Sequence, residues 1–324
     1  MEHPPKTVIS PHCPYILPVN KVFSNDFVNF CNTKLGISPS QVIEDISSWL
    51  KEDAGAGDVT LLSTFTKNPT ANFFIVAKQN FVLSGSQVMH QVFRETSGNS
   101  VSLFSNYQDG DKVNKGSVVF AGTGLAASIL LAERVALNFG CHISGVATKT
   151  HNILQLIENY IEPAISPPTL LETRKTTPGL RIYEKYATRT GGARNHRHAL
   201  DSGALLKENH LRAFGNVEEP LELLKKKAPI LTKVEIEVTN LIEFKAAMQN
   251  GADVIMLDNF SIPDIRLAVS ERNHKNPSVL LELSGNLDEK EMSEIVNCGV
   301  NFISMGALIH KAPWVDMSLQ LYLR

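Results

Sequence analysis

The sequence predicts an α/β protein in which a (β/α) barrel follows a smaller α+β module. In the last third of the chain, an apolar run followed by a helical stretch recurs. The runs begin at Val234, Val254, Val279 and Val300, and the intervals between them are 20, 25 and 21 residues. Strands that recur at such intervals with a helix between them form parallel βα units. Two further observations support this class: polar residues end each run, and the first 115 or so residues lack the repeat.

The repeating part supplies most of the predicted strands and helices. Apolar runs predict strands over residues 233–238, 254–258, 279–285 and 300–306. Helical patterns follow them over residues 241–249, 263–271 and 289–296. Two shorter runs upstream predict strands over residues 169–173 and 204–207. Together they make a set of parallel strands large enough for a barrel.

The first part of the chain predicts the smaller module. It has a helical pattern at residues 40–51, a glycine-rich turn at 55–58, and strand patterns at 71–77 and 117–121. A glycine turn at 122–124 then leads into a helix over 126–139 that ends in a turn at Gly140. The stretch 116–132 is uncharged, but it is shorter than the roughly 20 apolar residues that span a membrane and is interrupted by glycine. We therefore expect it to be buried within the protein.

Composition excludes several classes of protein. With 43% hydrophobic and 20% charged residues, the 324-residue chain can bury a large core, which argues against disorder. A net charge of −2 gives no general affinity for nucleic acid or membrane surfaces. The four cysteines are scattered singly and no C-x-x-C pair occurs, which favours a reducing compartment. The first residues do not resemble a signal peptide. We expect a cytoplasmic protein, with the nucleus as an alternative in a eukaryote.

Polar residues stand where the predicted strands end, and they predict a site there. They are Glu237, Asp258, the pair Ser284 and Gly285, and the triplet Ser304, Met305 and Gly306. The carboxyl ends of barrel strands form the catalytic face of such folds. Small residues after late strands let backbone N–H groups approach a phosphate. The sequence therefore predicts a binding site, with phosphate as a favoured ligand.

Basic charge is concentrated between residues 172 and 212. This segment has nine Lys or Arg against four acidic residues, a net +5, so the remaining chain carries −7. A solvated helix face is the ordinary explanation of such a run. Here, however, glycines and prolines interrupt the charges and no regular acid–base pairing at helical spacing runs through them. Loops over a barrel mouth, holding carboxylates or phosphates, are favoured.

The carboxylates Glu237 and Asp258 have three possible roles beside so much positive charge. They can act in acid–base catalysis, hold ribose hydroxyls or a hydrated Mg²⁺, or form structural ion pairs. The residues alone leave these roles open.

Nine segments between residues 57 and 310 carry a resemblance to a known family. They are GDVT (57–60), LLAERVALNFGCHISGVAT (130–148), ETRKTTPGLRIYEKYA (172–187), GGARNHR (191–197), LLKENH (205–210), VEIEV (234–238), ADVIMLDNF (252–260), LSGN (283–286) and ISMGALIH (303–310). With them the chain resembles the quinolinate phosphoribosyltransferases, also called carboxylating nicotinate-nucleotide pyrophosphorylases. The block over residues 173–181 is the most specific. Departures are modest: Glu172 and Glu208 stand where the family commonly has Asp, Ala199 where it often has Gly, and Ser202 where an acid is frequent.

The resemblance implies a type II phosphoribosyltransferase with an incomplete (β/α) barrel and a small N-terminal α+β sandwich domain. We expect an extension over residues 1–40, the sandwich domain over 41–145, the barrel with the active site over 146–310, and a C-terminal segment over 311–324 that packs on the N-terminal domain. The expected partners are quinolinate and phosphoribosyl pyrophosphate, with Mg²⁺ as cofactor and with neither nucleic acid nor membrane. The products are nicotinate mononucleotide, pyrophosphate and CO₂, a step of NAD biosynthesis. A homodimer with shared active sites is expected, and assembly into hexamers is left open.

The resemblance also assigns roles to single residues. The pocket for the two quinolinate carboxylates is implied to contain Arg174, Lys175, His196 and Arg197, with Thr173 beside them, Lys207 at its base, and Arg134 from the partner subunit. Glu237 and Asp258 match acids that engage the ribose and the metal, directly or through water. The phosphate loops are implied to contain Ser284, Gly285, Asn286, Ser304, Met305 and Gly306. The expected catalytic residues are Lys175, Lys207, Glu237 and Asp258.

Other residues receive simpler interpretations. His210 is expected to orient Lys207, and Met256 is expected in the core by alternation. Pairing of Arg134 with Glu133 is judged unfavourable because adjacent helical side chains diverge, which favours the intersubunit role. Two rival functions stay open: a phosphoribosyltransferase that releases no CO₂, and a catalytically silent binding protein on the same scaffold.

Overall fold

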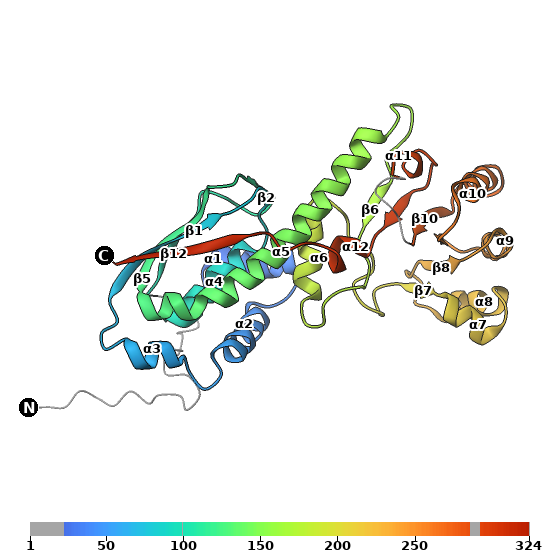
Figure 1. The fold of residues 1–324 in the computed structure, drawn as a ribbon. Coiled ribbons are helices and arrows are strands. Elements are labelled where there is room, and N and C mark those ends of the chain that lie inside the picture. The colour runs from blue at the N-terminus through green and yellow to red at the C-terminus, as the bar shows by residue number, and fades with distance from the viewer. Residues whose placement is uncertain (1–22, 99, 286–291, 324) are drawn as a thin grey trace, which may run out of the picture. The chain divides into compact units, whose positions relative to one another are not determined.

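The computed structural model describes residues 23–98, 100–285 and 292–323 (Figure 1). The chain divides into two compact units, one formed by residues up to Thr148 together with Pro313 onward, the other by Lys149–Ala312. Helix α5 (Ala126–Tyr160) runs across the division. Residues 1–22 of the expected N-terminal extension lie outside the described residues.

The first unit contains an antiparallel sheet in the strand order β12-β1-β5-β3. Its strands are β1 (Thr70–Ala77), β3 (Ser102–Phe104), β5 (Val118–Leu125) and β12 (Met317–Leu323). β2 (Phe81–Val82) and β4 (Lys112–Val113) form a separate pair. Strand β12 pairs with β1 from Ala71 opposite Leu323 to Ala77 opposite Met317, so the end of the chain completes the sheet of the first unit.

Helices complete the first unit. They are α1 (Asn25–Asn29), the π-helical segment η1 (Phe30–Leu35), α2 (Pro39–Ala54), α3 (Val59–Thr64), α4 (Ser86–Ser97) and the first part of α5. The Ser38 side chain caps α2 by accepting from the Gln41 N–H, as expected of serine at this position. Aromatic stacking joins the elements: Phe73 of β1 stacks on Phe93 of α4, with ring centroids 5.0 Å apart.

Two glycine turns predicted in this unit were wrong. Gly122 and Gly124 lie inside β5 and pair with β1, and α5 continues through Gly140 without a turn. A side chain at Gly122 would collide with the Phe73 ring, and one at Gly140 would collide with Met89 of α4. These glycines therefore allow close packing rather than ending an element.

The second unit contains a parallel sheet in the strand order β6-β11-β10-β9-β8-β7. Its strands are β6 (Thr169–Leu171), β7 (Ala204–Leu206), β8 (Val234–Val238), β9 (Val254–Asp258), β10 (Leu280–Ser284) and β11 (Phe302–Ser304). The first strand, β6, pairs with the last, β11, as it would in a closed barrel. In the strand order, β6 and β7 stand at opposite ends, so the barrel is open between them. The predicted α/β class, with a separate N-terminal domain, is confirmed.

Helices alternate with these strands, as βα units require. They are α6 (Arg181–Thr190), α7 (Glu208–Phe214), α8 (Glu218–Lys227), α9 (Leu241–Gln249), α10 (Ile262–Lys275), α11 (Met292–Ile295) and α12 (Ala307–His310). Local sequence starts them: Asn240 accepts the N–H groups of Ile242 and Glu243 at the start of α9, and Ser261 caps α10. The predicted helix over 241–249 has the observed bounds.

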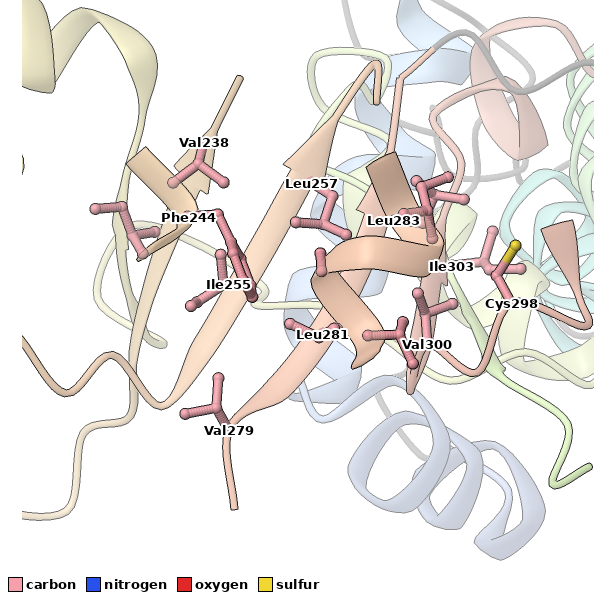
Figure 2. Packing of buried hydrophobic residues seen from close by; sticks show 14 of the residues in the cluster. Val238, Phe244, Ile255, Leu257, Val279, Leu281, Leu283, Cys298, Val300 and Ile303 are labelled. Carbon is pink, nitrogen blue, oxygen red and sulfur yellow. The ribbon is translucent and has the colours of Figure 1, made fainter. Parts of the chain in front are cut away.

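The core of the second unit lies between its sheet and its helices. Figure 2 shows Ile255, Leu257, Leu281 and Leu283 of the central strands packed with residues such as Phe244 of α9. Each fully buried apolar side chain of this kind contributes about 1.5–3 kcal/mol relative to an exposed one. This packing gives the strand ends a rigid support. Among the described residues, we find no helix that is both long and apolar enough to cross a membrane.

Candidate active site

A cavity of about 430 Å³ lies at the carboxyl ends of the second unit's strands. Its lining residues are Thr173, Arg174, Lys175, His196, Arg197, Leu205, Lys207, Glu237, Met256, Asp258, Glu282, Ser284 and Ser304. The volume lies in the range of small-molecule sites. The structure thus brings together ten of the site residues predicted from the sequence.

The acidic side of the cavity consists of Glu237 at the end of β8 and Asp258 at the end of β9. Glu237 Oε2 lies 3.5 Å from Lys207 Nζ. Burial and the charge of Glu237 raise the pKa of Asp258, against the opposing effects of the Asn259 hydrogen bond and of Lys175 and Lys207. Two facing carboxylates that raise each other's energy are suited to a cation or to developing positive charge between them.

Asn259 supports this acidic side directly. It is the one non-glycine residue with a positive φ, 53°, among those described, and its Nδ2 donates to Asp258 Oδ2 at 2.8 Å. Its backbone N–H donates to the Ser284 carbonyl at 3.1 Å. A side chain at Gly285 would collide with Asn259 Oδ1. Asn259 therefore joins the ends of β9 and β10, in a conformation that costs backbone strain.

The cationic side is formed by the connection between β6 and β7. Arg174 and Lys175 follow β6, whereas Arg197 lies beyond α6 and donates from Nη1 to the Gly203 carbonyl at 3.0 Å. Burial and the nearby charge of Arg174 lower the pKa of Arg197. The Nε of Arg174 is buried and lacks a hydrogen-bond partner among the described residues. Unpaired buried donors and neighbouring cations suit an anionic ligand.

His196 lies against two buried acids, Glu235 of β8 and Glu282 of β10. Its Nε2 is 3.1 Å from Glu235 Oε2 and 3.5 Å from Glu282 Oε2, and its Nδ1 accepts the Arg197 N–H at 2.7 Å. The side chain lines the cavity, but both ring nitrogens have protein partners. Its implied contact with a quinolinate carboxylate therefore competes with these bonds.

The contacts of His196, Glu235 and Glu282 determine how they are protonated. Burial alone would lower the pKa of His196, but hydrogen bonds to Glu235 and Glu282 and their charges raise it to about 10. That value favours a doubly protonated ring, whereas an Nδ1 that accepts a hydrogen bond carries no proton. Because Nδ1 accepts the Arg197 N–H, the ring carries its proton on Nε2. Burial and the charge of Glu282 raise the pKa of Glu235, where the extra proton can reside. The remaining proton on Nε2 leaves that nitrogen no lone pair for a metal, although the three groups lie close enough to ligate one.

The residues implied as phosphate loops have different settings. Ser284 and Ser304 line the cavity, and the Ser304 hydroxyl is buried without a partner among the described residues. Gly285 follows β10 with a φ of 124°, and a side chain at Gly306 would press against Lys175. Met305 is 3% exposed, belongs to the core of the second unit and is absent from the cavity lining. Asn286 lies outside the described residues.

Arg134 and His210 have different outcomes. Arg134, on α5 in the first unit, is absent from the cavity lining and pairs with Glu133 at 3.2 Å, so the judgement that this pairing is unfavourable was wrong. The Arg134 side chain is 62% exposed, which lets it bend back along the helix surface. The expectation for His210 agrees with the structure: its Nδ1 accepts the Lys207 N–H at 2.9 Å.

Met256 is 6% exposed and belongs to the core, as predicted, and its side chain also lines the cavity. Glu282 and Glu235 were not predicted from the sequence. Each stands two residues before a strand-end residue that was recognised, Glu235 before Glu237 and Glu282 before Ser284. Side chains two apart on a strand face the same way. An acid at such a position in an apolar strand was the available signal.

Glu237 and Asp258 fit the Mg²⁺ that the resemblance implies. Both are carboxylates, the ligand type that Mg²⁺ prefers, and their mutual repulsion would be relieved by a cation. Lys207 near Glu237 restricts the room for direct coordination, which favours a hydrated ion.

The fold and the cavity define a barrel-type α/β enzyme for anionic substrates. Comparisons with known proteins make the class specific. Family models for the C-terminal and N-terminal domains of quinolinate phosphoribosyl transferase match residues 146–320 and 58–144. The chain belongs to the quinolinate phosphoribosyltransferase family.

Individual relatives agree with this membership. A protein of Synechocystis, named probable nicotinate-nucleotide pyrophosphorylase [carboxylating], is 35% identical over 87% of this chain and 94% of its own length. A tobacco protein, named quinolinate phosphoribosyltransferase [decarboxylating] 1b, is 34% identical over 84% of this chain and 80% of its own. The solved structure of the nicotinate-nucleotide pyrophosphorylase from Francisella tularensis superimposes with a TM-score of 0.78 at 36% identity, covering 87% of this chain and 96% of that one.

Proposed function

We propose that this protein transfers the phosphoribosyl group of phosphoribosyl pyrophosphate to quinolinate and removes one carboxylate as CO₂. The products are nicotinate mononucleotide and pyrophosphate, in NAD biosynthesis. The observation that carries the proposal is one cavity with cations on one side, Arg174, Lys175, Arg197 and Lys207, and the carboxylates Glu237 and Asp258 on another. Family membership supports the same activity.

The cationic side suits the diacid. Arg174 and Arg197 offer planar guanidinium groups that can bind carboxylates through two hydrogen bonds, while Lys175 and Lys207 supply mobile charges. Tight pairing of a carboxylate with these groups would hold it in place rather than expel it. We infer that the firmest contacts are to the 3-carboxylate, which the product keeps.

The acidic side suits the transfer. As the bond from the anomeric carbon to pyrophosphate breaks, positive charge develops on the ribose ring, and Glu237 and Asp258 stabilise it. The pyridine nitrogen then bonds to that carbon. Bound Mg²⁺, held by Glu237 and Asp258 through water, would supply charge for the pyrophosphate oxygens. The C–C bond to the 2-carboxylate then breaks, its electron pair stays on the ring carbon beside the positive nitrogen, and a proton replaces CO₂.

The setting of the enzyme is part of the proposal. The exposed Arg134 is available to a second subunit, so a homodimer with shared active sites is the proposed assembly. The buried free cysteines Cys31, Cys141 and Cys298 are compatible with a reducing cytoplasm.

The test measures CO₂ from quinolinate labelled in the 2-carboxylate, with phosphoribosyl pyrophosphate and Mg²⁺ present. We expect labelled CO₂ and nicotinate mononucleotide in equal amounts, and a loss on the order of a hundredfold in kcat/KM for Lys207→Ala. Nucleotide without labelled CO₂ would identify a transferase that does not decarboxylate. Quinolinate binding without any turnover would identify a silent scaffold.

A further inference from the structure

Three cationic residues of the cavity reach it on two separate stretches of chain. Arg174 and Lys175 follow β6, and Arg197 follows α6. An isolated bridge between Leu171 and Arg194 connects these stretches through the backbone. Such a short ladder leaves the spacing between the cations dependent on side chains.

A buried ion pair supplies the missing connection. Glu172 and Lys185 are both fully buried, and Lys185 Nζ donates to Glu172 Oε1. The same carboxylate accepts the His196 N–H at 3.1 Å, Asn195 Nδ2 at 2.8 Å and the Thr188 hydroxyl at 3.3 Å. Lys185 Nζ also donates to the His196 carbonyl at 3.2 Å. The pair therefore holds the His196 backbone through both its N–H and its C=O.

The neighbouring residue of α6 holds the other stretch. Glu184 is fully buried, and its Oε2 accepts the Thr177 N–H at 2.9 Å. Glu184 and Lys185 thus tie α6 to the segment that carries Arg174 and to the segment that carries Arg197. Helix α6 is the common support of both.

The charges of the cavity explain why a strong support is required. Arg174 and Arg197 repel each other, and an anionic ligand needs both at short range. An acid that faced the cavity could hold them together only by occupying the positions of the ligand's carboxylates. A buried pair neutralises itself, so it can hold the backbone while the cavity cations stay available. Burying two charges is costly unless their hydrogen bonds are satisfied, and here the carboxylate accepts four.

We infer that Glu172, Lys185 and Asn195 are positioning residues that set the distance between Arg174 and Arg197, and thereby the affinity for the pyridine dicarboxylate. None of the three lines the cavity, so they act through the residues they hold. The inference rests on the proposed function for the identity of the dicarboxylate.

Two variants test this inference. Glu172→Gln/Lys185→Met removes both charges at similar volume. Asn195→Ala, at a half-buried position, removes the donor to Glu172 and the acceptor of the Arg189 Nη1. We measure KM for quinolinate and for phosphoribosyl pyrophosphate, and the Kd of quinolinate by calorimetry. We expect the quinolinate KM and Kd to rise about tenfold or more, and the KM of phosphoribosyl pyrophosphate to change less than about twofold. The matched control is Glu271→Gln/Lys275→Met, which removes a surface ion pair of the same unit and should change neither constant.

The outcomes separate the inference from the proposed function. A quinolinate KM and Kd that stay at wild-type values in Asn195→Ala would overturn the inference, and this variant decides if the double variant fails to fold. Equal rises for both substrates would also overturn it, because they indicate general loosening. If the wild-type protein releases no labelled CO₂, the proposed function is contradicted instead. Calorimetry with quinolinate still tests whether the buried network positions the cations.

Discussion

The acidic and cationic sides of the cavity are held in place by different means. Glu237 and Asp258 end strands that are paired along their length in the parallel sheet, with Glu237 opposite Met256. Arg174 and Arg197 lie on irregular segments held by buried side chains, chiefly the Glu172–Lys185 pair. Hydrogen bonding between strands therefore positions the acidic side, and a network of polar side chains positions the cationic side.

This difference indicates that the two sides have different functions, the acidic side in the transition state and the cationic side in binding the dicarboxylate. Strand ends in a packed sheet are suited to groups that act in the transition state, since their position is fixed by the core. Segments held by a buried network bring the cations to the distance that the ligand requires. We therefore expect changes on the acidic side to lower kcat and changes in the support of the cationic side to raise KM for the dicarboxylate.

The largest expected effect is that of Asp258→Asn. The substitution keeps the shape of the side chain and removes the charge that faces the developing positive ribose. We expect kcat to fall about a hundredfold to a thousandfold, with the quinolinate Kd close to that of the wild type. Calorimetry and steady-state kinetics check the two parts, and a raised quinolinate Kd with unchanged kcat would contradict this difference in function.

The contrast also explains what the sequence could and could not predict. Strand ends follow from periodicity, so the sequence alone predicts Glu237, Asp258 and Ser284. The Glu172–Lys185 pair has no periodic signal, because its two members come from a strand end and a helix 13 residues apart and meet only in three dimensions. Glu282 was missed because only strand-end residues were selected, and Glu282 lies two residues before the end of β10. Gly122 and Gly140 were misassigned because a glycine in a turn and a glycine at a close packing contact look alike in the sequence.

Asn259 offers an intermediate test on the acidic side. Asn259→Gly keeps the positive φ without strain but loses the donor to Asp258, and Asn259→Ala also adds about 1–2 kcal/mol of backbone strain. We expect both to lower kcat/KM about tenfold, and only the alanine variant to lower the melting temperature clearly. Equal melting temperatures would show that the positive φ of Asn259 carries no strain.

The pH dependence of the Asn259 variants follows from Asp258. Burial and the Glu237 charge raise the pKa of Asp258, and the Asn259 hydrogen bond lowers it. Without the donor this pKa rises further, so the carboxylate becomes protonated at a higher pH as acid is added. The acidic limb of the kcat/KM profile should therefore move to higher pH in Asn259→Gly. An unmoved limb would show that Asp258 ionisation does not govern it.

The smallest expected effect is that of Lys275→Met. This variant breaks an exposed ion pair, so comparing it with the Glu172–Lys185 pair shows what burial contributes. Lys275 Nζ lies 2.7 Å from Glu271 Oε1, but the lysine side chain is 60% exposed, whereas Lys185 and Glu172 are fully buried. Exposed pairs at this helical spacing contribute about 0.3–0.5 kcal/mol and weaken further in salt. We expect urea unfolding to show a loss of that size and kinetics to show none, because the lost bond holds only the surface of α10. A loss of quinolinate affinity in this variant would mean that the net charge of the protein, rather than the buried network, determines how the cationic side binds quinolinate.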